Sequence, residues 1–274
     1  MRDILRQYGI RPNHQLGQNF LCDKALIRRE VAYAEVDKLD VILEVGPGTG
    51  NLTRRLLERA ERVVAIERDR QFEPCLSDLQ KTYPHLELIW GDALEVDFPA
   101  FDKVVSNLPY KVTLPLLFKM LDHRFRRGTL IFQKRLAERI CARVGEKGYC
   151  RLSVAMGRRA NVEILETLGS SAFYPPPSVK SAVVSIERIK PRFDIPSENA
   201  FRILLEALFS YRDLSVEQAL AHANRRVFLP AAIGRISGKL RKKTVCQVTP
   251  REFGDIARAF GQLSRSQLDR FSPL

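Results

Sequence analysis

Short apolar runs alternate with amphipathic stretches through the first two thirds of the chain. Five runs have the length of buried strands: Val41–Val45, Val63–Ile66, Leu86–Trp90, Val104–Ser106 and Thr129–Phe132. Helical periodicity lies between them, in Leu52–Arg59, Gln71–Thr82 and Leu116–His123. This rhythm is typical of βαβ units and predicts an α/β fold with a mostly parallel, doubly wound sheet. Two later β-rich runs, Val162–Leu168 and Ala182–Ile189, bring the predicted sheet to seven strands as an antiparallel pair.

The pattern changes after a proline-containing break at Lys190–Pro196. Apolar residues then recur at helical spacing on one face: Phe201, Leu204, Leu205, Leu208 and Phe209. Ser215 with Gln218, and Thr249 with Glu252, have the spacing of capping boxes at helix N-termini. We therefore predict two domains, an α/β domain over residues 1–190 and a small all-helical domain over residues 197–274.

The charge balance points to a polyanionic partner. The 274 residues include 45 Lys and Arg against 32 Asp and Glu, a net charge of +13. Such an excess favours nucleic acid through counterion release, although a solvated basic surface is the alternative. No apolar run approaches the roughly 20 residues of a membrane span, and the N-terminus has no signal-peptide pattern, so we expect a cytoplasmic protein.

The five cysteines are scattered at Cys22, Cys75, Cys141, Cys150 and Cys246, without a Cys-x-x-Cys pair or a nearby cluster of histidines. This spacing favours neither a metal site nor a disulfide framework.

A glycine-rich turn follows the first predicted strand. Gly46, Gly48 and Gly50 alternate within Glu44–Gly50, and a predicted helix comes next. Asn51 stands where the dinucleotide fingerprint would have its third glycine. The turn fits better beside a nucleoside with an amino-acid tail, such as S-adenosylmethionine, although a plain tight turn would look similar.

Acidic residues follow the next two strands. Glu67 ends the second strand, where Rossmann-like sheets place an acid against ribose hydroxyls, and Asp92 follows the third, where it could accept a hydrogen bond from the adenine amine of the cofactor. Either acid could instead cap a helix. Because parallel strands end at one edge of the sheet, the glycine turn, Glu67 and Asp92 should lie close together, which favours a cofactor site.

The fourth strand ends in Asn107-Leu108-Pro109-Tyr110. The exocyclic amine of adenine is a poor nucleophile because its lone pair is delocalised into the ring. Two acceptors aimed at its hydrogens, the Asn107 side-chain oxygen and the Leu108 carbonyl, would free that lone pair. Pro109 would fix the turn and Tyr110 could stack on the base. The alternative is a strand-end turn with a packed tyrosine.

Access to an unstacked base calls for a second aromatic ring on its opposite face. Phe173 is our candidate, in the proline-rich loop that continues to Pro177. The alternative is that Phe173 packs in the core.

Taken together, these motifs resemble the ribosomal RNA adenine N6,N6-dimethyltransferase family. The likeness covers most of the chain and rests on Leu16–Leu21, Glu44–Gly50, Glu67, Gly91–Leu94, Asn107–Tyr110, Arg151–Val154, Phe173–Ser181 and the helical C-terminal region. It implies a Rossmann-like class I methyltransferase that uses S-adenosylmethionine. It also implies an N-terminal lid over about residues 1–36. The implied cofactor pocket contains Gln18, Asn19, Leu21, Gly46, Gly48, Glu67, Asp92 and Asn107, and the implied catalytic residues are Asn107, Leu108, Pro109, Tyr110 and Phe173.

The resemblance also implies a substrate: two adjacent adenosines in a hairpin loop near the 3′ end of small-subunit ribosomal RNA, each receiving two methyl groups. The expected partner is the immature small ribosomal subunit, in whose maturation the family takes part, and the C-terminal domain would help to hold the enzyme on that particle. We expect a monomer.

Five positions depart from the pattern of the family: Gln15, Arg135, Cys150, Leu214 and Glu217. Gln15, Leu214 and Glu217 stand where basic residues are usual, Arg135 where glutamate is usual, and Cys150 where glycine is usual. Since the catalytic motifs are intact, we expect weaker RNA docking rather than loss of the reaction.

Three alternatives remain open. One is the related antibiotic-resistance branch, which methylates an adenine of large-subunit ribosomal RNA. Another is a DNA adenine methyltransferase, for whose target-recognition domain little length remains. The third is a ribosome-assembly factor with a vestigial methyltransferase site.

Overall fold

The structure, a computed structural model, describes residues 1–13, 16–223 and 233–260. The chain divides into two compact units, residues 1–137 with 161–188, and residues 138–160 with those from 189 onward. Gln15, one of the five unusual positions, lies outside the described residues.

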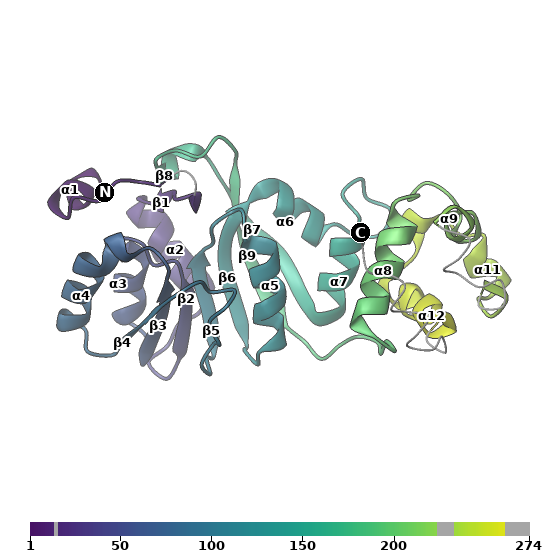
Figure 1. The fold of residues 1–274 in the computed structure, drawn as a ribbon, viewed down its shortest axis with the longest axis horizontal. Coiled ribbons are helices and arrows are strands. Elements are labelled where there is room, and N and C mark those ends of the chain that lie inside the picture. The colour runs from purple at the N-terminus through teal and green to yellow at the C-terminus, as the bar shows by residue number, and fades with distance from the viewer. Residues whose placement is uncertain (14–15, 224–232, 261–274) are drawn as a thin grey trace. The chain divides into compact units, whose positions relative to one another are not determined.

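The first unit is built on a seven-stranded sheet in the order β4-β3-β2-β5-β6-β9-β7 (Figure 1). Its strands are β2 (Val41–Val45), β3 (Arg62–Glu67), β4 (Leu86–Trp90), β5 (Lys103–Asn107), β6 (Arg127–Gln133), β7 (Ala160–Leu168) and β9 (Ser181–Arg188). The first five run parallel, and β9 is antiparallel to β6. The predicted mixed sheet of seven strands is confirmed.

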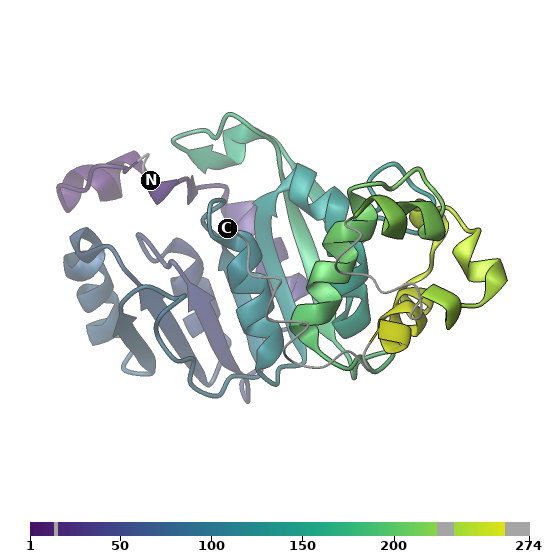
Figure 2. The same cartoon turned by 45° about the vertical axis from the view of Figure 1, so that its right-hand side comes forward.

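Helices cover both faces of this sheet. They are α2 (Lys24–Tyr33), α3 (Asn51–Leu57), α4 (Glu73–Thr82), which follows the 3₁₀ turn η2 (Arg70–Phe72), and α5 (Thr113–Asp122). The next helix, α6 (Lys134–Cys141), spans the boundary between the two units. Apolar residues of α2, α3 and α4, among them Ile27, Leu56 and Leu79, share one buried cluster with Ile42 and Val105 of the strands. Helix α5 lies on the near side of the sheet in Figures 1 and 2. Central strands are therefore buried on both faces, which explains their nearly continuous apolar sequences.

The strand order reverses between β2 and β5, since β3 and β4 extend to one side and β6 to the other. Open α/β sheets bind ligands at such a switch point, outside the carboxyl ends of the strands. The glycine turn after β2 and the tip of β5 lie on its two sides, so the topology brings together the two motifs on which the predicted site depends.

A two-stranded sheet joins the N-terminal segment to a later loop. β1 (Phe20–Leu21) pairs antiparallel with β8 (Phe173–Tyr174), next to the 3₁₀ turn η3 (Ser170–Ala172), and α1 (Arg2–Gln7) precedes them. Residues 16–21 are thereby held at the carboxyl edge of the main sheet.

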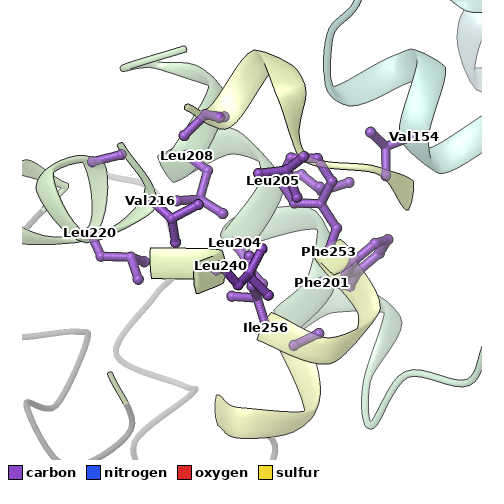
Figure 3. Close-up of a cluster of buried hydrophobic side chains, with 14 of the residues drawn as sticks. Val154, Phe201, Leu204, Leu205, Leu208, Val216, Leu220, Leu240, Phe253 and Ile256 are labelled. Atoms are coloured by element: carbon purple, nitrogen blue, oxygen red, sulfur yellow. The ribbon is translucent and has the colours of Figure 1, made fainter. Parts of the chain in front are cut away.

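The second unit is helical. It contains α7 (Arg151–Arg159), α8 (Glu198–Phe209), α9 (Val216–His222), α11 (Gly238–Arg241), η4 (Val245–Gln247) and α12 (Pro250–Phe260). Figure 3 shows its core, where Leu205 of α8 and Phe253 of α12 lie in one apolar cluster with Val154 of α7. Residues 138–160, which the sequence pattern groups with the first domain, belong to this unit because Tyr149 and Val154 are buried in its core.

Both predicted capping boxes are confirmed. At α9 the Gln218 N–H donates to Ser215 Oγ, and the Ser215 N–H donates to Gln218 Oε1. At α12 the Glu252 N–H donates to Thr249 Oγ1, and the Thr249 N–H donates to Glu252 Oε2. Each box satisfies backbone donors that a helix N-terminus leaves unpaired.

Candidate active site

Two adjoining cavities open at the carboxyl edge of the sheet, with about 770 Å³ and 600 Å³ of space including open solvent. They share Leu16, Gly46, Glu67, Arg68 and Pro109. The first is also lined by Gln18, Asn19, Leu21, Glu44, Gly48, Asn51, Asn107, Leu108 and Tyr110 among others, and the second by Asp92 and Ala93. Every predicted cofactor residue therefore lines one of two spaces that share five lining residues.

The glycine turn forms the floor of the first cavity. Gly46 and Gly48 have φ of 75° and 55°, a left-handed conformation that side chains disfavour. A Cβ on Gly48 would lie 3.2 Å from the Phe20 ring, so glycine also permits close approach of the N-terminal segment. The turn thus presents bare backbone to the cavity.

Glu67 lies buried at the end of β3. Its Oε2 accepts the Gly48 N–H at 3.1 Å, and its Oε1 accepts the N–H groups of Arg68 and Asp69 at 2.9 and 2.8 Å. Burial raises the pKa of Glu67, and these three bonds partly offset that rise. A carboxylate has about four acceptor positions, so one stays available for a ligand hydroxyl.

Asp92 follows β4 and is already engaged on both oxygens. Oδ1 accepts the Leu94 N–H at 2.9 Å, and Oδ2 forms an ion pair with Arg68 Nη1 at 3.1 Å. Asp92 therefore stabilises the turn that follows β4 and also lines the cavity wall; no helix begins there, so the helix-capping alternative does not apply to it.

The geometry of Asn107 defines its chemistry. Its Nδ2 donates to the Asn19 carbonyl at 2.8 Å. Since a carbonyl can only accept, this contact assigns the amide nitrogen to the N-terminal segment and leaves Oδ1 as the acceptor for the cavity. Asn107 is thereby oriented by a residue 88 positions earlier in the chain.

The residues after Asn107 form a rigid turn. The Leu108 N–H donates to the Ile131 carbonyl at 3.0 Å, and the Pro109 carbonyl accepts the Val112 N–H at 3.1 Å. The Tyr110 hydroxyl lies 2.6 Å from Ser181 Oγ, and burial raises its pKa. These bonds fix the peptide whose carbonyl is the second predicted acceptor, and they anchor the aromatic ring at the cavity.

The N-terminal segment is fastened to the same edge. Gln18 Nε2 donates to Asp69 Oδ2 at 2.7 Å, and the Leu21 carbonyl accepts from Asn51 Nδ2 at 3.1 Å. The segment thus covers the glycine turn through side-chain contacts as well as through β1.

Phe173 lies elsewhere. It is 3% exposed, pairs with Leu21 across β1 and β8, and belongs to the buried cluster of α2 and α3. It is not among the residues that line either cavity. Phe173 therefore packs in the core, as the alternative interpretation expected. The small sheet of β1 and β8 places its ring next to Leu21 and away from solvent.

Arg68 and Glu44 are among the cavity residues that have no role in the sequence-based site. Arg68 lines both cavities and carries the ion pair with Asp92. Glu44 is 2% exposed, and its Oε2 has no hydrogen-bond partner within the described part of the chain. Burial, with a contribution from Glu67, raises the pKa of Glu44 to about 8. The position of Glu44 in the sequence, two residues before Gly46, could have indicated that it lies at the cavity.

Four of the unusual positions lie in described regions. Arg135 is exposed on α6, and Cys150 is the N-cap residue of α7. Leu214 is half-buried before α9, and Glu217 forms an ion pair with Arg241 at 3.6 Å. Glu217 therefore offsets a cation of the helical unit.

Among the described residues, no helix is long and apolar enough to cross a membrane, and no group of three His, Cys, Asp or Glu residues is placed to hold a metal ion.

Comparison with known proteins identifies the family. Residues 9–258 match the family described as ribosomal RNA adenine dimethylase. The chain belongs to this family. A relative of this dimethylase is the probable ribosomal RNA small subunit methyltransferase A of Thermococcus onnurineus, 40% identical over 92% of this chain and 94% of the relative. The protein of the same name from Pyrococcus abyssi is 38% identical over 89% and 99% of the two chains.

Solved structures agree on the fold. A dimethyladenosine transferase from Plasmodium falciparum has a TM-score of 0.75, with 26% identity over 89% of this dimethylase and 98% of that chain. The 23S rRNA methyltransferase ErmE has a TM-score of 0.67, with 26% identity over 89% and 100%. This dimethylase is therefore a Rossmann-like rRNA adenine dimethyltransferase, and its family and fold imply S-adenosylmethionine as the methyl donor.

Proposed function

We propose that this dimethylase transfers two methyl groups to N6 of each of two adjacent adenosines, in a hairpin loop near the 3′ end of small-subunit ribosomal RNA. Support for the small subunit comes from relatives of that name at 40% and 38% identity over nearly the whole chain. The observation that carries the chemistry is the orientation of Asn107, whose amide nitrogen faces Asn19 and whose oxygen is left for the base.

The residues around the glycine turn fit S-adenosylmethionine. Within the described residues the buried Oε2 of Glu44 lacks a partner, which the ammonium group of an amino-acid tail would supply. Glu67 retains an acceptor position for a ribose hydroxyl, and Asp92 would face the adenine from the second cavity. Gln18, Asn19 and Leu21 would cover the cofactor, with Gly46 and Gly48 beneath it. The bound cofactor supplies an electrophilic methyl group on a sulfonium.

The chain itself prepares the nucleophile. In the first transfer Asn107 Oδ1 and the Leu108 carbonyl would accept the two hydrogens of the adenine amine and so direct its lone pair toward the methyl group. In the second transfer one of them would accept the single remaining hydrogen, and each transfer releases one amine proton to solvent. The ring of Tyr110, held through Ser181, would stack on the base. Alignment of the two reactants is the main contribution of the protein, and the reaction needs no ionisable base.

Recognition of the particle would depend on charge. A net charge of +13 favours an RNA partner, and we propose the immature small subunit as the substrate. The ion pair between Glu217 and Arg241 reduces the positive charge of the helical unit, which fits weaker docking by that unit. A monomeric state stays a prediction.

The test uses labelled S-adenosylmethionine with unmodified small subunits or, in parallel, large-subunit RNA. After digestion to nucleosides, label in N6,N6-dimethyladenosine from the small subunit is expected. Label only from large-subunit RNA would instead support the activity named in ErmE, and particle binding without transfer would support an assembly factor.

Asn107→Ala should lower transfer by about 100- to 1,000-fold, because it removes an acceptor that acts on the reacting amine. RNA binding, measured by filter retention of the same subunits, should stay within about twofold of the wild type. Retained turnover would mean that Asn107 is not the acceptor.

A further inference from the structure

The ammonium group of Lys119 on α5 donates three hydrogen bonds, all to one loop. Its Nζ lies 2.9 Å from the Ala93 carbonyl, 3.0 Å from the Leu94 carbonyl and 2.5 Å from the Val96 carbonyl. An ammonium group has three donors, so each finds a carbonyl of the segment that follows β4. Nζ also lies 4.5 Å from the centroid of the Phe98 ring.

The loop that Lys119 contacts, residues 91–98, contains no strand or helix of its own. Asp92 organises it from within: Oδ1 accepts the Leu94 N–H, and the Asp92 carbonyl accepts the N–H groups of Glu95 and Val96. These bonds turn the amides of the loop toward Asp92. The carbonyls of residues 93, 94 and 96 converge on the other side, where Lys119 receives them.

The same loop forms a wall of the second cavity through Gly91, Asp92 and Ala93. Ala93 is buried, so removing the ammonium would leave a carbonyl there without its donor, and the loop would rearrange. Lys119 itself does not line the cavity. It can therefore influence a ligand only through the position of Asp92 and its neighbours.

We propose that Lys119 is a positioning residue for the adenosine half of the cofactor, acting by clamping the loop that carries Asp92. This inference rests on the cofactor placement proposed above. It concerns binding of the nucleoside, not methyl transfer, because the clamp acts at the second cavity while Asn107 lines the first.

The test compares Lys119→Met, which keeps the length of the side chain and removes its donors, with the wild type by isothermal titration calorimetry. S-adenosylmethionine and 5′-methylthioadenosine, which lacks the amino-acid tail, are titrated separately. Both dissociation constants should rise about tenfold or more and by similar factors. At saturating cofactor kcat should stay within about twofold of the wild type, so that the effect appears in KM.

Hydrogen exchange on the ligand-free proteins provides a second measurement. Amides of residues 91–98 should exchange faster in Lys119→Met, while the strands keep their protection. Lys81→Met is the matched control, since Lys81 forms only an exposed ion pair with Asp78 at 2.9 Å, and it should leave both ligands unaffected. Lys119→Gln, which keeps two N–H donors, should give an intermediate loss and serves if the methionine variant does not fold.

Unchanged affinities in both Lys119 variants would overturn the inference alone. A loss confined to S-adenosylmethionine, with 5′-methylthioadenosine bound normally, would also overturn it, because the adenosine half would then not depend on the clamp. Failure of the wild type to bind either ligand would overturn the proposed function together with this inference.

Discussion

A buried acid lies near each end of strand β2, and the two differ in their hydrogen-bond and ion-pair partners. Asp40, directly before the strand, is 0% exposed and bonded to Lys103 Nζ at 2.7 Å and to Arg126. Glu44, near the other end, is 2% exposed, yet its Oε2 has no hydrogen-bond partner among the described residues, and burial raises its pKa to about 8. Four residues apart, one carboxylate is completed by the protein and the other is left incomplete. The incomplete one lines the cavity, so the comparison separates an acid that the protein pairs with cations from one whose protonated form burial favours.

The largest effect should come from breaking the completed end. Lys103→Met removes the buried cation and leaves Asp40 with the exposed Arg126 and the Asp37 N–H, so the free energy of unfolding should fall by about 3–5 kcal/mol. Urea denaturation measures the change. A loss below about 1 kcal/mol would show that Arg126 and the Asp37 N–H, which also bonds to Asp40, are enough.

Substitution of Glu44, at the other end, should raise the free energy of unfolding rather than lower it. The pKa of Glu44 is raised by burial from 4.5 to about 8, so the protonated form is favoured in the folded state. Its contribution to stability is therefore complete below about pH 4.5 and is lost as the pH rises through about 8. Glu44→Gln removes this loss and should stabilise the ligand-free protein by about 2–4 kcal/mol near pH 8, with little change near pH 5.

Thermal unfolding between pH 5 and 8.5 measures that difference. Glu30, fully buried with a raised pKa and without partners for its oxygens in the described structure, should leave part of the slope in the variant. The same Glu44→Gln variant should bind S-adenosylmethionine more weakly. Equal pH slopes in the two proteins would mean that Glu44 is ionised throughout and that the contrast with Asp40 is unfounded.

The smallest change in stability should come from breaking an exposed ion pair between β3 and β4. Arg62 and Glu87 form an ion pair at 2.9 Å, with side chains 45% and 42% exposed. Arg62→Met should change the free energy of unfolding by less than about 1 kcal/mol, because water already solvates both groups. Measured beside Lys103→Met, it isolates burial as the cause; equal losses in the two variants would contradict that explanation.

Most of the site could be predicted because parallel strands carry their ends to one edge. Gly46, Glu67, Asp92 and Asn107 each follow a recognisable strand, so sequence order alone brings them together. The resemblance to a known family added the N-terminal residues Gln18, Asn19 and Leu21, which no periodicity would place there.

What could not be predicted depends on contacts distant in sequence. Phe173 in a proline-rich loop looks the same whether it faces a base or a core, and only its pairing with Leu21 decides. The grouping of residues 138–160 with the helical unit depends on burial of Tyr149, whose hydroxyl donates to the Val248 carbonyl at 2.8 Å. The clamp at Lys119 likewise joins α5 to a loop 23–26 residues earlier.

The bond between Asn19 and Asn107 has one further consequence. An amide rotated by half a turn exchanges oxygen for NH₂, and the tip of β5 would then repel the amine it has to receive. The carbonyl of Asn19 opposes this rotation, so the polarity of the proposed catalytic tip depends on a separate segment of chain. A small molecule that displaced residues 16–19 would free the Asn107 amide to rotate, and it would also remove Gln18 and Asn19 from the wall of the first cavity.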